Sequence, residues 1–394
     1  MSEFAARPSR SATRRKPAAL ASLDIDQWRT LADRAVEPNA YYLADWELAL
    51  DASGRDRTNV SALTARDDIP SAKSGAGPLL GLIPVISAWR AYRIPFPVLV
   101  SADPYGTLCT PLLDRGLAND VAAKLLREAR ALGQRALILR NVALEGAAMK
   151  AFTAALERDG IRPHTLQAHA RACLDATRDA DELLRDALGV KKLKELRRQR
   201  NRLAEHGEVS FQVARTPGDV TQALETFLAL EASGWKAQRG TALLQHSGDA
   251  TFIRRAAKAL AERDQCEIVT LCAGHTPVAS AIVLRHHDRA FYFKLGVDEN
   301  FAKFSPGVQL TLDLTRHLCA DPAIAMVDST AAPGHPMIDP IWRGRLAIGD
   351  VLIPLRRRDP IGPFVRVALA LRQLMRAPAR RAVQIIRKRQ EKNT

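Results

Sequence analysis

Three consecutive residues, Ser305-Pro306-Gly307, have the chemistry of an anion-binding site. Serine is favoured at the cap position before a helix, and proline suits the first helical turn. Gly307 keeps side-chain bulk away from the first backbone N–H groups. Such a helix start exposes unpaired N–H groups and carries partial positive charge, so it can hold a phosphate. An ordinary capped helix after a strand has the same local sequence, and the context must decide between the two.

Two residues downstream of this helix could transfer protons. Asp328 lies near the end of an apolar run, 324–329, where a parallel strand would open into a cleft. Its carboxylate is therefore a candidate base or a ligand for a substrate amine, and the alternative is an aspartate that caps the following turn. His335 lies in the turn Pro333–Pro336, and histidine is a natural proton shuttle near neutral pH. A solvated turn histidine is the alternative.

A lysine and a tryptophan–lysine pair are candidates for ligand contacts. Lys294 is in the middle of the predicted strand 290–297, where a charge is costly unless it faces a cleft or an edge of the sheet. We expect either an edge position or a contact with a phosphate or an acidic substrate. Trp235 and Lys236 end a predicted helix and are predicted to line the substrate side. A core tryptophan at a plain helix end is the alternative.

The positive charge of the chain is concentrated at its two ends. The 394 residues have a formal net charge of +15. Residues 1–20 hold five basic residues and one acid, and residues 356–394 hold twelve basic residues and two acids. The body between them is nearly neutral, which argues against DNA as a partner. Basic ends attract any polyanion, including an anionic membrane surface.

The cysteines and the hydropathy indicate in which cellular compartment the protein is expected. The five cysteines are widely spread and form no CxxC pair, so neither disulfides nor a zinc site are indicated, and we expect no metal. No apolar run approaches the length of a membrane span. A cytoplasmic setting fits best, with peripheral contact at the inner membrane face as an option. The tail 356–394 favours either helices on an anionic membrane or a helix docked on its own domain.

The elements that must position these residues fall into two similar halves. In the first half, 23–178, we predict strands over 60–64, 79–88, 96–101, 136–142 and 164–174 and helices over 41–50, 117–132 and 145–158. In the second half, 207–355, we predict strands over 209–214, 266–273, 277–285, 290–297, 324–329 and 348–354 and helices over 217–232, 249–263, 306–318 and 336–345. A basic helical linker, 179–206, joins the halves, and 1–22 is predicted to be a disordered basic tail. Both halves contain strands, then a helix, then a parallel-type strand, which predicts an internal duplication.

The segment 220–345 resembles the acetyltransferase domain of the GNAT superfamily, and most of all the CelD-like branch of cellulose-biosynthesis acetyltransferases. The matching features, in order, are Phe227–Lys236, the strand 266–272, Gly274–Ser280, Ser305-Pro306-Gly307, Val327-Asp328 and the turn from Gly334 to Trp342. The hairpin has one residue more than the branch pattern. The helix start departs from the commoner GNAT loop, which leaves the acyl carrier open. The duplicated halves are similar to the tandem arrangement of FemAB-type transferases.

This resemblance implies a fold and a site. The fold is α+β, with two tandem GNAT-like domains that each have a mixed, mostly antiparallel sheet flanked by helices. The donor is acetyl-CoA or another acyl-CoA, with its pyrophosphate on Phe304, Ser305, Pro306, Gly307 and Val308 and its pantetheine arm along Tyr292, Lys294, Gly296 and Val297. Asp328 and His335 would be catalytic. Trp235, Lys236, Asp339 and Trp342 would contact the acceptor.

Three functions fit these observations. We favour an N- or O-acetyltransferase whose acceptor, a small molecule or a cell-envelope or exopolysaccharide saccharide, attacks the thioester directly. The second is a FemAB-type transferase, with charged tRNA held by the basic linker helix. The third is a non-catalytic accessory protein of polysaccharide synthesis.

Overall fold

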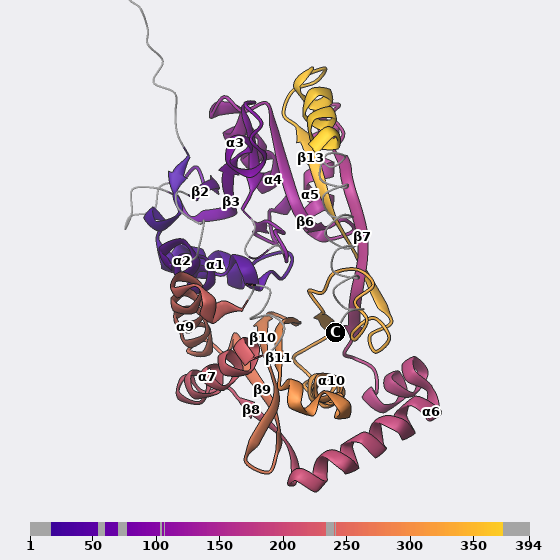
Figure 1. Ribbon diagram of the computed structural model, residues 1–394. Coiled ribbons are helices and arrows are strands. Elements are labelled where there is room, and N and C mark those ends of the chain that lie inside the picture. Colours follow the sequence, from indigo (N-terminus) through magenta and orange to yellow (C-terminus); the bar gives the residue numbers. More distant parts are fainter. Residues whose placement is uncertain are drawn as a thin grey trace, which may run out of the picture.

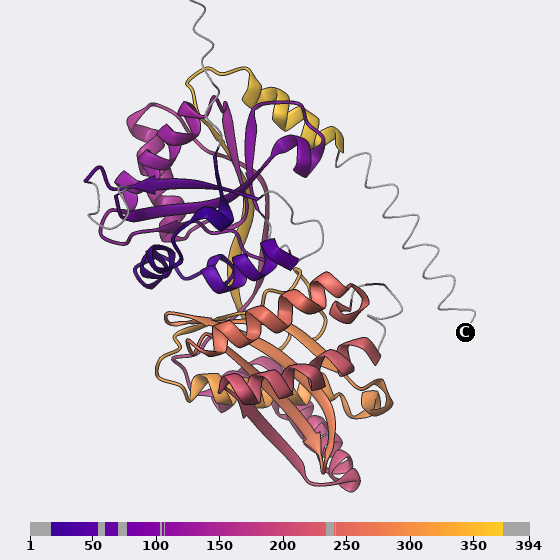
Figure 2. The same cartoon turned by 90° about the vertical axis from the view of Figure 1, so that its left-hand side faces the viewer.

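The computed structural model describes residues 17–53, 60–69, 77–102, 105, 107–233, 240 and 242–372. In this part of the chain a single sheet of thirteen strands runs through two halves. The two views show the first half, indigo to magenta, stacked on the second half, pink to orange (Figures 1 and 2). Among the described helices none is long and apolar enough to cross a membrane.

The first half is an antiparallel meander that ends in a parallel strand. Strand β3 pairs antiparallel with β2 and β4, and β4 pairs parallel with β6. Helix α4 lies in the connection that makes the parallel pairing possible. The strands are β1 (Ala18–Ala19), β2 (Ser61–Arg66), β3 (Leu79–Ser87), β4 (Val98–Ser101), β5 (Leu112–Leu113) and β6 (Ala136–Ala143), and the helices are α1 (Ile25–Asp33), α2 (Ala44–Ser53), α3 (Ala88–Tyr92), α4 (Ala118–Ala131) and α5 (Ala147–Arg158).

The second half repeats this order. Strand β10 pairs antiparallel with β9 and β11, and β11 pairs parallel with β12 through the connecting helix α10. The strands are β8 (Val209–Ala214), β9 (Cys266–Ala273), β10 (Thr276–His286), β11 (Arg289–Val297) and β12 (Met326–Asp328). The helices are α6 (Ala180–Leu203) before the sheet, then α7 (Pro217–Ser233), α9 (Ser247–Ala261), a 3-10 turn η5 (Glu299–Phe304) and α10 (Pro306–Cys319).

Two long strands join the halves by exchange. Strand β7 (His164–Asp175) leaves the first half and pairs with β12 of the second, whereas β13 (Gly344–Pro354) leaves the second half and pairs with β6 of the first. The two strands also pair with each other along nearly their whole length (Figure 1). The strand predicted at 348–354 therefore completes the sheet of the first half. The boundary at 355 for the second domain remains a proposal, because β13 lies before that boundary in the sequence but pairs with β6 of the first half.

An aromatic core also spans the two halves. Trp46 of α2 meets Phe252 of α9 edge-on, with ring centroids 4.9 Å apart, and Tyr41 meets Phe291 of β11 at 5.7 Å. All four side chains are fully buried in one hydrophobic cluster. Because large aromatic side chains bury the most apolar area per residue, this cluster fixes the halves against each other.

The predicted fold class is confirmed, since a mixed and mostly antiparallel sheet flanked by helices repeats in both halves. Two local predictions are wrong. The segment 336–345 forms turns rather than a helix before β13 starts at Gly344. Ser305 takes the cap position of α10 but has left-handed backbone angles (φ 52°, ψ 52°), and its side chain makes no capping hydrogen bond.

Candidate active site

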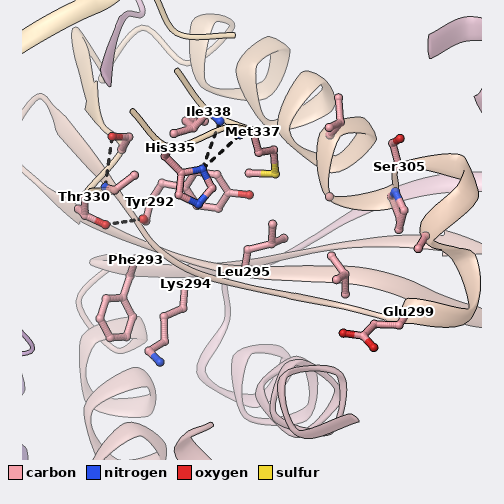
Figure 3. A pocket seen from close by; sticks show the side chains of 17 residues that line it. Tyr292, Phe293, Lys294, Leu295, Glu299, Ser305, Thr330, His335, Met337 and Ile338 are labelled. Atoms are coloured by element: carbon pink, nitrogen blue, oxygen red, sulfur yellow. Dashed lines mark hydrogen bonds between the residues drawn. The ribbon is translucent and has the colours of Figure 1, made fainter. Parts of the chain in front are cut away.

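The sheet opens beside β11, and a cavity fills the opening. Strand β12 pairs only with Arg289–Phe291, so among the described strands the remaining part of β11 has a neighbour on one side alone. The cavity next to it measures about 790 Å³. Its walls come from β11, from η5 with the start of α10, and from the segment 329–338 (Figure 3).

One end of the cavity is formed by the start of α10. Ser305, Pro306, Gly307 and Val308 all line it. The missing side-chain cap leaves the first backbone N–H groups without a capping oxygen from Ser305, and Pro306 has no N–H to offer. A Cβ atom on Gly307 would lie only 3.0 Å from Leu295 Cδ2 and 3.2 Å from Val297 Cγ1. Glycine therefore lets the helix start approach β11 closely, and the exposed N–H groups can hold an anion.

Hydroxyl groups tie α10 and the segment after β12 to the same strand. Thr311 of α10 donates to the carbonyl of Gly307 (2.8 Å), and its Oγ1 lies 3.2 Å from the Tyr292 hydroxyl. Thr330 donates from Oγ1 to the Tyr292 carbonyl (2.7 Å). Burial raises the pKa of Tyr292, so this phenol stays protonated at neutral pH. These bonds set the width of the cavity between β11 and the segment 329–338.

His335 lies at the other end of the cavity, beside Tyr292 (Figure 3). The backbone N–H groups of Met337 and Ile338 both point at its Nδ1, at 3.4 Å each. A nitrogen that accepts hydrogen bonds carries no proton, so in the neutral imidazole the proton is on Nε2. His335 is thus oriented as a hydrogen-bond donor through Nε2.

Asp328 does not line the cavity. Its side chain is fully buried and forms an ion pair with the equally buried Arg171 of β7. The backbone N–H of Thr330 donates to its other oxygen (2.9 Å). This geometry favours a structural role over the base predicted from the sequence.

Lys294 turns to the opposite face of β11. Its Nζ lies 2.9 Å from a carboxylate oxygen of the buried Glu231 on α7, whose second oxygen accepts from the backbone N–H of Leu243 (2.9 Å). Lys294 pairs with Ile282 of β10 but lies beyond the part of β11 that β12 pairs, so it lies at a local edge of the sheet. Figure 3 shows the Lys294 side chain pointing away from the labelled groups around His335.

A second cavity of about 330 Å³ lies on this opposite face. Phe293 and Lys294 border both cavities, so only β11 separates them. The other described residues that line the second cavity come from both halves: Tyr105, Thr107, Gly240, Ala242, Leu243, His246 and Asp249.

Three of the other predicted site residues lie outside the first cavity. Gly296 faces α7, where an added Cβ would be 2.9 Å from the backbone nitrogen of Glu231. Phe304 is buried against the ring of His206, at a centroid distance of 5.4 Å. Asp339 accepts from the backbone N–H of Gly334 (3.1 Å) and so closes a turn.

Trp342 is also a core residue rather than a wall of the cavity. It is fully buried, its Nε1 donates to Thr315 of α10 (3.0 Å), and its ring lies 5.7 Å from that of Tyr292. Trp235 and Lys236 lie outside the described residues, so their predicted roles stay untested. The structure brings together Tyr292, Lys294, Val297, Ser305, Pro306, Gly307, Val308 and His335.

Several residues of the cavity carried no signal in the sequence. They are Glu299, Ala302, Ser329, Thr330, Ala331, Met337 and Ile338. Thr330 is the most informative of them, because it follows the strand end at Asp328 and ties it to Tyr292. A hydroxyl residue directly after a predicted parallel strand was the available hint. In the described residues no three His, Cys, Asp or Glu side chains are placed to share a metal ion.

Comparison with known proteins agrees with this geometry. Residues 190–334, which include β11, α10 and the strand end at Asp328, match the model of the acetyltransferase (GNAT) domain family. The chain carries a GNAT-type acetyltransferase domain. The match supports an acyltransferase, whereas the acyl donor and the acceptor are not decided by it. No curated protein sequence matches the chain.

Solved structures extend the likeness to both halves. FemX superposes with a TM-score of 0.53 at 9% sequence identity, over 87% of this chain and 98% of its own. A conserved protein of unknown function from Bacteroides thetaiotaomicron has a TM-score of 0.53 at 14% identity, over 86% of this chain and 99% of its own. The C-terminal domain of a putative lysylphosphatidylglycerol synthetase from Agrobacterium fabrum has a TM-score of 0.51 at 14% identity, over 91% of this chain and 96% of its own. At these identities the likeness concerns the fold alone.

Proposed function

We propose that this protein transfers an acyl group, with acetyl the first candidate, from acyl-CoA to an amine or hydroxyl of a polar acceptor. One observation carries the proposal: the cavity beside β11 has an uncapped helix start at one end and the Nε2–H donor of His335 at the other. The amides of Gly307 and Val308 would hold the pyrophosphate. The pantetheine arm would lie along Tyr292–Val297.

The reaction needs little side-chain chemistry. The acceptor nitrogen or oxygen attacks the thioester carbonyl carbon, the tetrahedral intermediate collapses, and the carbon–sulfur bond breaks. His335 would donate from Nε2 to the negative charge that develops in the transition state, as an oxyanion donor does. The acceptor gives its proton to solvent water, and the CoA thiolate takes one from solvent. A neutral imidazole with Nδ1 already accepting is suited to donation rather than to proton abstraction.

The acceptor would enter from the second cavity. Only β11 separates the second cavity from the first cavity, where the acyl donor would bind. The lining of the second cavity includes the hydroxyl of Thr107, the carboxylate of Asp249 and the imidazole of His246. Polar groups of this kind suit a hydroxyl- or amine-bearing molecule such as a saccharide. The CelD-like resemblance of the sequence favours a cell-envelope or exopolysaccharide acceptor.

Titration calorimetry with acetyl-CoA tests the donor directly. The wild-type chain should bind saturably, and Gly307→Glu should bind much more weakly than the size-matched Gly307→Gln, because only glutamate places a negative charge against the pyrophosphate. Gly218→Glu adds the same charge at the start of α7, where an added Cβ meets nothing within 4 Å, and should leave binding unchanged. Absence of acetyl-CoA binding to the wild-type chain would overturn the proposal.

A second candidate, aminoacyl transfer from charged tRNA, rests on a cationic cavity between α6 and α10. This cavity measures about 670 Å³, and Lys194, Arg197 and Arg198 line it, all three exposed. Helix α6 bends around it at Gly189, whose backbone is non-helical (φ 72°, ψ 163°). Here the donor would be a polyanion rather than a thioester.

The second candidate predicts tRNA binding that weakens steeply with salt. Arg197→Glu/Arg198→Glu should reduce it further, while acetyl-CoA should not bind. Absent or salt-insensitive tRNA binding would exclude this candidate and leave the acyl-CoA reaction in place.

A further inference from the structure

The helix over 361–372 presents apolar side chains on two faces, one buried and one exposed. On one face Val365 is fully buried, and Ile361, Ala368 and Leu369 pack against the core of the first half. On the other face Phe364, Val367 and Leu371 are 61%, 58% and 54% exposed. These three residues are spaced by three and four positions, so they form one stripe on the helix. The inner face accounts for the docking of the helix, whereas the outer stripe has no role within the described fold.

An exposed tryptophan lies on the neighbouring helix. Arg372 connects the two helices, because its Nη1 donates to the Ala91 carbonyl of α3 (3.1 Å) and its guanidinium lies 5.0 Å from the ring centroid of Tyr92. Trp89 of α3 is 52% exposed. Figures 1 and 2 show the helix over 361–372, in yellow, on the first half at the end away from the second. Four large apolar side chains from two distant segments thus lie at one end of the molecule.

Positive charge surrounds these side chains. The segments 88–93 and 356–372 contribute seven arginines, Arg90, Arg93, Arg356, Arg357, Arg358, Arg366 and Arg372, and one acid, Asp359. Asp359 is already paired with Arg135. The sequence that follows, 373–394, adds seven basic residues and one acid. The apolar stripe therefore lies in a strongly cationic environment.

We propose that this end of the first half docks on an anionic phospholipid membrane. Trp89, Phe364, Val367 and Leu371 enter the boundary between headgroups and acyl chains, and the surrounding arginines contact lipid phosphates. Tryptophan favours this boundary, and an apolar stripe flanked by basic side chains is the pattern of interfacial helices. A single apolar stripe binds weakly, and each basic residue near an anionic surface adds to the affinity, so the two features act together.

Charge also distinguishes a membrane from a second copy of the chain. A symmetric dimer through this stripe would bring the same arginines of two chains against each other, and Asp359 is the only acid in these segments to offset them. A membrane rich in phosphatidylglycerol supplies the opposite charge instead. This inference concerns a surface of the first half and is independent of the chemistry proposed for the second.

Vesicle co-sedimentation of the full chain tests the proposal. We expect binding to phosphatidylglycerol-containing vesicles, little binding to pure phosphatidylcholine vesicles, and weakening at high salt. Phe364→Ser/Val367→Ser/Leu371→Ser should lower the partition coefficient about ten-fold or more, since each large apolar side chain contributes at the interface. Val190→Ser, at a residue of α6 that is 73% exposed, is the matched control and should bind like the wild type.

Three outcomes would overturn the proposal. The first is no binding of the wild-type chain to anionic vesicles. The second is a triple variant that folds with an unchanged melting temperature and still binds like the wild type, which would assign binding to the basic tail alone. The third is a wild-type chain that is dimeric by analytical ultracentrifugation and becomes monomeric in the triple variant, with vesicle binding unaffected, which would make the stripe a contact between two copies.

Discussion

Arg171 of β7 and Asp328 of β12 form a buried ion pair across the strand exchange. Arg171 comes from the first half of the sequence and Asp328 from the second. The same guanidinium donates from Nη1 to the Thr107 carbonyl (2.6 Å), so it also anchors Thr107, which lines the second cavity. The pair therefore joins three segments that are far apart in the sequence.

Removing one member of this pair should destabilise the protein strongly. Asp328→Ala leaves the Arg171 charge buried without its counter-ion, and we expect the free energy of unfolding to fall by about 3–5 kcal/mol in urea denaturation. Asp120→Ala is the matched control, because it removes an ion pair with Arg158 whose side chains are more than half exposed. Asp120→Ala should lower the free energy of unfolding by less than about 1 kcal/mol.

The double variant Arg171→Met/Asp328→Leu separates structure from catalysis. Both charges are absent, so most of the stability should return. If the folded double variant still transfers acyl groups, Asp328 is not the base. Loss of turnover with restored stability would instead return Asp328 to the catalytic role predicted from the sequence.

His335 should affect turnover more than donor binding. His335→Ala removes the Nε2–H donor, and we expect kcat to fall by about 10²–10³-fold with little change in the Kd for acetyl-CoA. His335→Gln can still donate and should recover part of the loss. His275→Ala alters an exposed histidine in the turn between β9 and β10 and should be silent. A weaker Kd with unchanged kcat would show that His335 only shapes the cavity.

Lys294 should matter for stability rather than for binding of the donor phosphates. Its ammonium pairs with the buried Glu231, so Lys294→Met should lower the free energy of unfolding by about 3 kcal/mol. Adding Glu231→Gln should recover part of the lost stability, and a double-mutant cycle measures the coupling energy between Lys294 and Glu231. The Kd for acetyl-CoA should stay within about two-fold of wild type. A ten-fold weaker Kd would mean that Lys294 reaches the phosphates, as the sequence-based alternative holds.

Acid should weaken the contact between the two halves at His286. This buried residue at the end of β10 accepts at Nδ1 from the backbone N–H of Asn39 (2.8 Å), and its Nε2 lies 3.0 Å from the Ala32 carbonyl. Burial, reinforced by the neighbouring His287, lowers the pKa of His286 to about 3. Below pH 6.5 the unfolded chain therefore binds a proton that the folded chain does not.

The stability contributed by neutral His286 is complete above pH 6.5 and is lost as the pH falls toward 3. Between these pH values His286 lowers the free energy of unfolding by about 1.4 kcal/mol for each pH unit of acidification. His286→Gln offers an acceptor and a donor that do not titrate. In denaturation series from pH 7 to 5, the difference in the free energy of unfolding between wild type and variant should therefore decrease by about 1.4 kcal/mol per pH unit below pH 6.5. A difference that is constant with pH would contradict this assignment.

Local patterns of the sequence were sufficient to predict most elements of both halves. Alternating and helical hydropathy located β2 to β4, β6 to β12 and the helices α4, α5, α7, α9 and α10 to within a few residues. The start of α10 was predicted at Pro306, because proline and glycine constrain the backbone through neighbouring residues alone. A cofactor site in the second half was predicted on this basis, and residues 190–334 of that region match the GNAT domain model.

Long-range pairing could not be predicted from these patterns. The exchange of β7 and β13 depends on pairing between strands that are more than a hundred residues apart in the sequence. The hydropathy periodicity of a strand is the same whether it pairs within its own half or with the other half. The ion-pair partners of Asp328 and Lys294 could not be predicted for the same reason, since Arg171 and Glu231 lie far away in the chain.

The sequence by itself determined the order of most elements, the start of α10 at Ser305–Val308 and the concentration of charge at the two ends. The tertiary structure alone decided which polar groups face the cavity, that Nε2 of His335 is the donor, and that Phe364, Val367 and Leu371 remain exposed beside Trp89. The reason is physical: backbone conformation follows mainly from neighbouring residues, whereas burial and the pairing of charges depend on atoms that only the complete fold brings together.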